Sequence, residues 1–202
     1  KKLKKFRPDI TKNIILILVI IIFLFLINYY QEKLMNKSDS ESIKIGGSFI
    51  LTDKNETLFN SKIIEKYKII YFGYTFCPDV CPFDVLKLSN FFSNNKELIK
   101  YIQPIFITLD PERDNSETLR NFLDNFNPQI IGLTGTETMI TNTLNKFRVY
   151  KKISSGNKVS MDYLIDHTAL FYILDKKDNY ITHLSSKNFN EEFNQFVRKN
   201  FY

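Results

Sequence analysis

A short apolar run that leads into a pair of cysteines constrains the fold of this chain more than any other segment. Residues 69–73, Ile-Ile-Tyr-Phe-Gly, have the character of a buried strand, and Cys77 and Cys81 follow shortly afterwards. Pro78 and Pro82 suit the first turn of a helix, where a missing N–H group costs no hydrogen bond. The only two cysteines of the sequence are therefore predicted to lie at a strand-to-helix turn.

The spacing of the two cysteines favours a metal site or a redox pair. Residues i and i+4 share one face of a helix, so both sulfurs can point at one spot. A helix N-terminus also favours the thiolate, which is the form that binds metals and attacks disulfides. A thioredoxin-type oxidoreductase normally separates its cysteines by two residues, whereas three separate them here. A structural disulfide or two inert thiols are the plainer alternatives, although closing so short a loop adds little stability.

The chain has two histidines, and His167 is the better candidate for a third ligand to a soft metal. The polar Asp-His-Thr at 166–168 directly precedes an apolar run, and this run, residues 169–174, is expected to form a core strand with His167 at its mouth. Asp166 can steer the imidazole ring from outside the ligand set. His183 lies at the end of the last predicted strand and is expected to be an ordinary packed or solvated histidine.

Strands alternate with helices over residues 43–202, which is enough chain for one domain. This pattern predicts an α/β fold with a central mixed sheet and helices on both faces, and a site at the carboxyl ends of its strands. Strands are expected at 49–51, 57–59, 69–74, 102–109, 129–133, 169–174 and 180–184, and helices at 84–92, from 116 to before Pro128, at 137–147 and at 190–200.

Two further clusters have structural interpretations. The carboxylates of Asp110, Glu112 and Asp114 are expected to form a turn in which Asp114 or Ser116 caps the next helix and Arg113 pairs with a carboxylate, rather than an acid/base pair. The aromatic residues Phe72, Tyr74 and Phe76 are expected to be core and to wall the cysteine site.

Five segments follow one another in an order and at a spacing typical of one protein family. They are Gly-Gly-Ser-Phe-Ile-Leu-Thr-Asp at 46–53, Gly-Tyr-Thr-Phe-Cys-Pro-Asp-Val-Cys-Pro at 73–82, Leu-Asp-Pro-Glu-Arg-Asp at 109–114, Ile-Gly-Leu-Thr-Gly at 131–135 and Asp-His-Thr-Ala at 166–169. Over residues 43–202 the chain thereby resembles the Sco/SenC family of copper proteins. It departs from many relatives at Thr168, where they have serine, and at Leu109, where they have valine, and neither change touches a metal-binding group.

The resemblance implies a thioredoxin-like fold, one copper ion per chain bound by Cys77, Cys81 and His167, and a role in assembling the binuclear copper A centre of cytochrome c oxidase. The copper-bearing subunit of the oxidase would then be the partner, while no segment identifies the copper donor. Two thiolates and one imidazole also suit three-coordinate Cu(I), whereas structural zinc normally takes four protein ligands.

The alternative function is a thiol–disulfide oxidoreductase, in which Cys77 and Cys81 are catalytic and reduce the cysteines of a copper-site target protein. The two functions differ at His167, which only the copper carrier needs. A peroxide-reducing enzyme of the same fold would be a third possibility, but the sequence has no recognisable peroxidase motif.

The basic character of the chain comes from its first twelve residues. Residues 1–12 hold six lysines and arginines against Asp9, a net charge of +5 out of +6 for the whole chain, which leaves +1 for the rest. The sequence pI of about 9.1 is therefore a property of this tail and not of a basic binding face. The main electrostatic reason to expect a nucleic-acid partner is thus removed.

An unbroken apolar run at residues 14–27 lies within the segment 13–30, which is just long enough to span a bilayer. We predict a basic tail at 1–12 on the cytoplasmic or matrix side, a single transmembrane anchor at 13–30 and a polar tether at 31–42. A cleavable signal peptide is the alternative, but no small-x-small site follows the run. The soluble domain is then expected on the outer side of a bacterial inner membrane, in the periplasm, or in the mitochondrial intermembrane space.

Overall fold

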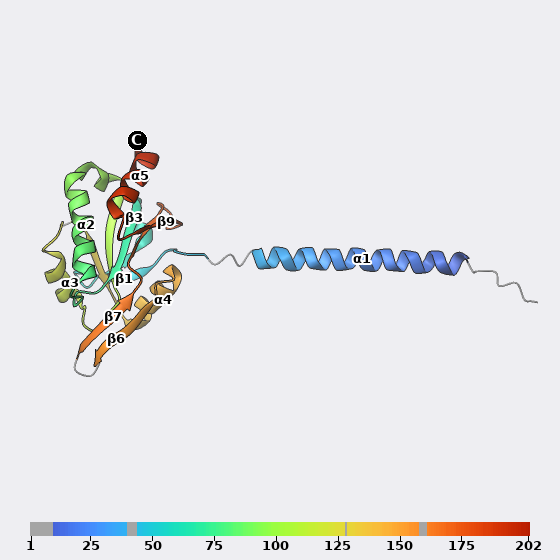
Figure 1. Ribbon diagram of the computed structural model, residues 1–202, viewed down its shortest axis with the longest axis horizontal. Coiled ribbons are helices and arrows are strands. Elements are labelled where there is room, and N and C mark those ends of the chain that lie inside the picture. The colour runs from blue at the N-terminus through green and yellow to red at the C-terminus, as the bar shows by residue number, and fades with distance from the viewer. Residues whose placement is uncertain (1–9, 40–43, 128, 158–160) are drawn as a thin grey trace, which may run out of the picture. The chain divides into compact units, whose positions relative to one another are not determined.

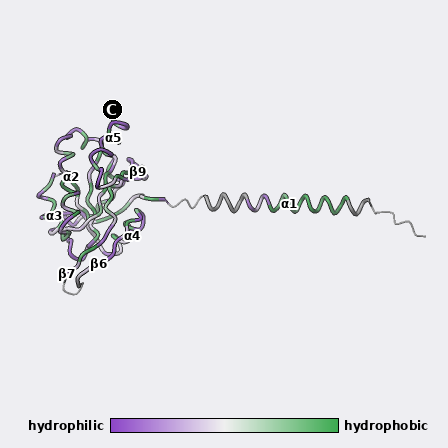
Figure 2. Tube along the Cα trace, viewed as in Figure 1, coloured by the Kyte–Doolittle hydropathy of each residue, from purple (hydrophilic) through white to green (hydrophobic). Residues whose placement is uncertain are grey.

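The computed structural model describes residues 10–39, 44–127, 129–157 and 161–202 (Figure 1). The chain forms two units, residues 1–43 and 44–202, each with its own internal contacts. In the first unit, helix α1 (Ile10–Asp39) is apolar along the part coloured green in Figure 2. Its segment Ile14–Gln31 is long and apolar enough to cross a membrane. A signal sequence has the same properties, so the uncleaved anchor stays a prediction.

The second unit is built on a seven-stranded mixed sheet with the order β2-β1-β5-β4-β3-β8-β9. Strand β3 pairs in parallel with β4, and β4 with β5, whereas all other neighbours in this sheet are antiparallel. The strands are β1 (Ile50–Asp53), β2 (Leu58–Asn60), β3 (Tyr67–Gly73), β4 (Ile102–Thr108), β5 (Ile131–Thr134), β8 (Leu170–Leu174) and β9 (Tyr180–Ser185). The predicted mixed sheet is confirmed.

Helices cover both faces of the sheet, also as predicted. They are α2 (Val80–Asn94), α3 (Ser116–Leu123), α4 (Glu137–Phe147) and α5 (Phe189–Phe201), with short 3-10 helices at Ser61–Ile63 and Lys96–Lys100. Successive side chains of β3 point to opposite faces. Phe72 packs its ring 5.2 Å from that of Phe147 on α4, whereas Tyr71 stacks against Phe171, which in turn contacts Phe189 on α5. The cysteine-bearing helix α2 lies on the Tyr71 side, together with α5.

The core strand expected after His167 is confirmed as β8, which begins at Leu170 and is buried along most of its length. A further strand, β7 (Asp162–His167), precedes it and was not expected from the sequence. Strand β7 pairs with β6 (Lys151–Asn157) in a two-stranded ribbon separate from the main sheet. In β7 only Tyr163 and Ile165 are buried, which is the alternation of a half-buried strand rather than of a core strand.

A buried ion pair ties β3 to the turn between β8 and β9. The Nζ atom of Lys68 lies 2.7 Å from Oδ1 of Asp178, and both side chains are almost completely buried. The other carboxylate oxygen of Asp178 accepts a hydrogen bond from the Ser61 hydroxyl, which itself accepts from the N–H of Phe49. Because each buried charge is compensated only by its partner, removing one of them is costly.

We therefore expect Asp178→Asn to lower the free energy of unfolding by about 3 kcal/mol, since it leaves the Lys68 ammonium buried without a counter-charge. Asparagine tolerates the positive φ of 65° at this position, so backbone strain adds little. Urea unfolding followed by circular dichroism measures the change. The control is Glu97→Gln, which breaks the exposed pair with Lys100 and should leave stability unchanged. An equal effect of both substitutions would contradict the assignment.

Candidate metal centre

The three predicted ligands meet at the carboxyl end of β3. Cys77 lies in the turn after β3, Cys81 is a fully buried residue in the first turn of α2, and His167 is the last residue of β7. The Sγ atom of Cys81 lies 3.3 Å from Nε2 of His167, and the backbone N–H of Cys81 points at Sγ of Cys77 across 3.5 Å. The strand-to-helix turn thus brings the two sulfurs together, and the end of β7 brings the imidazole to the Cys81 sulfur.

Gly73 allows the first turn of α2 to approach β3 this closely. A Cβ atom at this position would lie 3.1 Å from Sγ of Cys81 and 2.9 Å from Cε1 of Tyr71. The distance to Tyr71 is shorter than real Cβ atoms show and the distance to the sulfur is unusually tight, so a larger residue would require the ring to shift and would crowd the sulfur. The absence of a side chain at the end of the strand therefore fixes the position of Cys81.

The ring of His167 is oriented by a backbone carbonyl and by two tyrosines. Its Nδ1 atom lies 3.1 Å from the carbonyl oxygen of Thr168, and the Tyr71 and Tyr74 rings contact the imidazole edge to face, with centroids 6.3 Å and 6.1 Å away. If Nδ1 carries the proton and donates it to this carbonyl, Nε2 keeps a lone pair that faces the sulfurs. The expected steering by Asp166 is wrong, because its side chain is exposed and the Thr168 carbonyl takes this place.

The two thiols differ in their protonation. The hydrogen bond with Cys81 lowers the pKa of the Cys77 thiol, and the contact with His167 acts in the same direction. The same hydrogen bond, with burial as the second cause, raises the pKa of Cys81. Cys77 is also the more accessible thiol, since it is only half-buried. In the metal-free protein Cys77 is therefore the nucleophilic cysteine and Cys81 the enclosed one.

The donor set fits a soft metal ion. A sulfur and a nitrogen on one ion, at about 2.3 Å and 2.0 Å as for zinc, lie roughly 3.5 Å apart. The observed 3.3 Å between Cys81 and His167 is close to that value. As the side chains lie, no three His, Cys, Asp or Glu residues in the described part of the chain already form a ligand group. Closing the set on an ion thus requires a small movement, for which the half-buried Cys77 has room.

The turn that follows β4 holds the ribbon that carries His167. The Nε atom of Arg113 lies 2.5 Å from the Asp110 carboxylate, its Nη1 donates to the carbonyl of Tyr163 at 2.9 Å, and its guanidinium stacks 3.6 Å from the centre of the Tyr163 ring. The hydroxyl of Tyr163 donates back to Asp110 at 2.7 Å. The predicted pairing of Arg113 with a carboxylate is confirmed, and Asp110 has a structural role.

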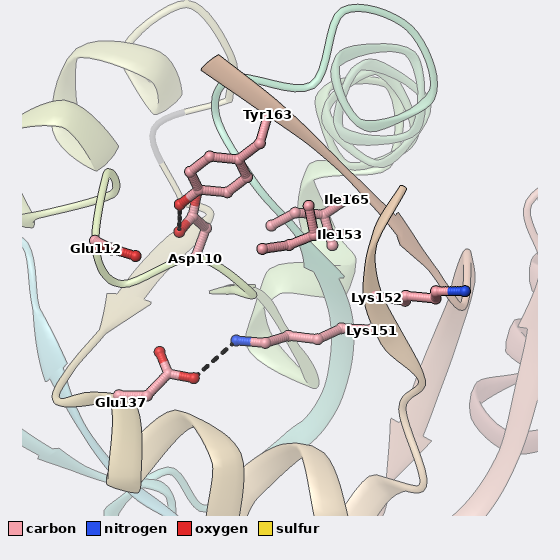
Figure 3. Close-up of a pocket in the computed structure, with 8 residues that line it drawn as sticks. All are labelled: Asp110, Glu112, Glu137, Lys151, Lys152, Ile153, Tyr163 and Ile165. Atoms are coloured by element: carbon pink, nitrogen blue, oxygen red, sulfur yellow. Dashed lines mark hydrogen bonds and ion pairs between the residues drawn. The ribbon is translucent and has the colours of Figure 1, made fainter. Parts of the chain in front are cut away.

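A pocket of about 250 Å³ opens between this turn, the start of α4 and the ribbon (Figure 3). Figure 3 shows the Tyr163–Asp110 hydrogen bond on one wall and an ion pair between Lys151 and Glu137 on another. The pocket is lined by Asp110, Glu112, Glu137, Lys151, Lys152, Ile153, Tyr163 and Ile165. It contains neither cysteine nor His167, so it is distinct from the candidate metal centre.

Two of the smaller expectations are wrong and two are confirmed. The cap of α3 is Asn115, whose side chain accepts from the N–H of Thr118, whereas Asp114 accepts from the Thr75 hydroxyl inside the domain. Phe76 is 53% exposed and does not belong to the core, although Phe72 and Tyr74 do, as predicted. His183 is exposed and contacts the Tyr180 hydroxyl, as expected of an ordinary surface histidine.

Sequence reasoning missed two residues next to the sulfurs. Tyr71 was part of a predicted core strand, and Asp84 was the first residue of a predicted helix, yet both lie buried beside Cys81. The helix begins at Val80, earlier than expected, so Asp84 lies three residues after Cys81 on the same face. The sequence did contain a signal for Asp84, because a carboxylate three residues after a cysteine on a helix lies on the same face as that cysteine.

Comparisons with known proteins agree on one family. The SCO1/SenC family model matches residues 37–200. A SCO2-like protein of Rickettsia prowazekii is 41% identical over 145 residues, which are 71% of this chain and 70% of the relative. The mitochondrial SCO2 protein of Saccharomyces cerevisiae is 39% identical over 154 residues, 75% of this chain and 50% of that protein.

A solved structure extends the similarity to three dimensions. The copper-bound ScoI structure of Bradyrhizobium japonicum has 35% sequence identity and a TM-score of 0.69, and the match covers 77% of this chain and 98% of that one. The residues matched by the family model, 37–200, include the sheet, the cysteine turn and the ribbon. The chain belongs to the SCO1/SenC family, and its second unit has the thioredoxin-like fold of these proteins.

Proposed function

We propose that this protein binds one copper ion per chain through Cys77, Cys81 and His167 and delivers it during assembly of the copper A centre of cytochrome c oxidase. The observation that carries the proposal is the 3.3 Å approach of the His167 imidazole to the buried Cys81 sulfur, with Cys77 beside it. A copper-bound relative with 35% identity supports the choice of metal. The copper-bearing subunit of the oxidase is the proposed recipient.

The two cysteines differ in burial, and this difference suits a metal ion that the protein has to release to a partner. Cys81 and His167 are held by the core and by the ribbon, while Cys77 is half-buried and faces the open side. Three soft donors satisfy Cu(I), and a fourth ligand from a partner can approach only from that side. Phe76 and Phe83, which are 53% and 60% exposed, provide apolar surface on the same turn and helix for such a partner.

We expect the full chain in detergent to bind one equivalent of Cu(I) under anaerobic conditions, and Cys81→Ser to abolish tight binding, because a hydroxyl is a poor ligand for a soft ion. Competition with a chromophoric Cu(I) chelator measures the affinity. Ser89→Ala, which removes a buried hydroxyl elsewhere on α2, is the control and should bind like the wild type. Undiminished affinity of Cys81→Ser would exclude the proposed ligand set.

A thiol–disulfide oxidoreductase is the second candidate, favoured by the low pKa of the accessible Cys77 thiol. The Cys77 thiolate would attack a disulfide of the target and release one target thiolate, and Cys81 would then attack the mixed disulfide and release the second. The target gains two electrons, and the protein ends with a Cys77–Cys81 disulfide. This chemistry needs both cysteines but no metal bond from His167.

His167→Ala separates the two candidates. We expect it to weaken Cu(I) binding at least tenfold, because one of three metal bonds is lost, while leaving much of the disulfide-reducing activity of the dithiol. In cells, the variant should fail to assemble the oxidase, and excess copper should restore assembly at least in part. His183→Ala, which changes the exposed histidine, is the matched control. Normal oxidase assembly in His167→Ala cells together with failure in Cys77→Ser cells would favour the oxidoreductase.

We further propose that α1 anchors the protein as a single span, with the lysine-rich tail at residues 1–12 on the cytoplasmic or matrix side. The apolar length of Ile14–Gln31 and the cationic residues before it support this orientation. The copper-binding unit would then lie in the periplasm or the intermembrane space, where thiols are exposed to oxidants.

A reporter enzyme fused after Tyr202 should accordingly be active only on the outer side of the membrane. Amino-terminal sequencing of the membrane-bound protein should still find the lysine-rich tail, because an anchor is not removed. A mature N-terminus near Asn28 or later would show a cleaved signal peptide instead.

A further inference from the structure

Two buried polar groups beneath Cys81 have no role in the site described so far. The Tyr71 hydroxyl and Oδ2 of Asp84 are both enclosed, and neither has a hydrogen-bond partner at ordinary distance within the described residues. Tyr71 and Asp84 are also completely buried as whole residues. Leaving a buried donor and a buried carboxylate oxygen unpaired is costly, so such groups in a folded protein usually have a function.

The other oxygen of Asp84 connects this group to the surface. Oδ1 accepts from the Lys87 ammonium at 2.8 Å and from the Ser186 hydroxyl. Lys87 is partly exposed and also donates to the carbonyl of Ser186 at 3.0 Å. Lys87 and Ser186 therefore hold one oxygen of Asp84 from its outer side, while the second oxygen stays enclosed.

The Tyr71 side chain has both Cys81 and Asp84 as neighbours. An added Cβ on Gly73 would touch both Cε1 of Tyr71 and Sγ of Cys81, which places the ring edge beside the sulfur. Cys81 and Asp84 are three residues apart on α2 and so share the helix face that packs on β3. Burial first, and then the nearby Cys81 and Asp84, raise the pKa of the Tyr71 phenol, so it keeps its proton.

A phenol has a single proton to donate, and the otherwise unpartnered Tyr71 hydroxyl has two acceptor groups as neighbours. One is the carboxylate oxygen of Asp84, and the other is the sulfur of Cys81, which is shielded from water. We propose that Tyr71 is a positioning residue whose hydroxyl donates either to Asp84 or to the reduced sulfur of Cys81, and that Asp84 thereby limits how far the protein stabilises that sulfur. This inference rests on the proposed use of Cys81 as a ligand or redox thiol.

The consequence is that Tyr71 and Asp84 together adjust how easily the dithiol of Cys77 and Cys81 is oxidised. Donation from Tyr71 stabilises the reduced sulfur and withdraws electron density from it, whereas donation to Asp84 leaves the sulfur electron-rich and easier to oxidise. The pair Tyr71 and Asp84 therefore sets the balance between the dithiol, which can accept a metal, and the Cys77–Cys81 disulfide, which cannot.

The test measures the dithiol–disulfide equilibrium of the metal-free full chain, in detergent, in glutathione buffers of defined ratio. Glutathione disulfide takes two electrons and two protons from Cys77 and Cys81, which form an S–S bond, and becomes two molecules of glutathione. Because no copper is present, a failure of this inference is distinguishable from a failure of the proposed metal binding.

We expect Tyr71→Phe to raise the equilibrium constant for oxidation about tenfold, a shift of about 30 mV toward the disulfide, since the reduced sulfur loses its donor. Asp84→Asn should shift it at least threefold in the opposite direction, because a neutral amide competes less for the hydroxyl, while its oxygen still accepts from Lys87 and Ser186. Tyr172→Phe removes another buried tyrosine hydroxyl, on β8, and should change nothing.

The double variant Tyr71→Phe/Asp84→Asn distinguishes a shared proton from a simple charge effect. Without the hydroxyl, the effect of Asp84→Asn should disappear. If it persists, the carboxylate acts on the sulfur through its charge alone and the inference is wrong. The inference is equally wrong if Tyr71→Phe leaves the dithiol–disulfide equilibrium unchanged, or if Tyr172→Phe shifts this equilibrium as much as Tyr71→Phe does.

If Tyr71→Phe does not fold, Asp84→Asn alone still tests the inference. No shift of the equilibrium in Asp84→Asn, or a shift toward the disulfide, overturns it.

Discussion

The close contact between the first turn of α2 and the end of β3 is the constraint on which the candidate metal centre depends. Gly73 leaves room for the Cys81 sulfur, and a Cβ atom there would be only 3.1 Å away. Once this sulfur is fixed against the strand, Cys77 is placed one helical turn before it, and Tyr71 lies beside it. Gly73, the end of β3 and the first turn of α2 together determine where the two sulfurs lie, and none of these features would do so alone.

The third donor reaches the site by a different route. His167 is the last residue of a ribbon outside the main sheet. Arg113 stacks on Tyr163 of this ribbon, and Asp110 accepts a hydrogen bond from the Tyr163 hydroxyl. A ligand carried by such a ribbon can be displaced with less energy than one inside a seven-stranded sheet, because fewer backbone hydrogen bonds have to be given up. The site therefore joins the buried Cys81 sulfur of the core to two less buried donors, Cys77 on the turn and His167 on the ribbon.

The sequence was most informative where chemistry and local pattern agreed. The apolar run before Cys77 and the proline-flanked turn predicted the strand, the helix and the position of both sulfurs, and His167 was chosen because few alternatives existed. The ribbon was missed because β7 has only two buried side chains, so its short alternation is a much weaker strand signal than the apolar run of β8. The Tyr71–Asp84 contact could not be predicted, because it depends on which faces of β3 and α2 meet, and that is decided by tertiary packing.

The burial of Cys81 excludes water from its sulfur, and it also explains why the neighbouring polar groups strongly affect the properties of this sulfur. A sulfur that water cannot reach takes its hydrogen bonds from the protein alone, so each neighbouring donor has a larger effect than it would at the surface. Cys77, half-buried and of lowered pKa, can instead exchange with solvent or with a partner. The protein thus encloses one sulfur and leaves the other accessible, and this division is compatible with both proposed functions. What separates the two functions is the imidazole that the ribbon brings to the buried sulfur, because only a metal ion requires it.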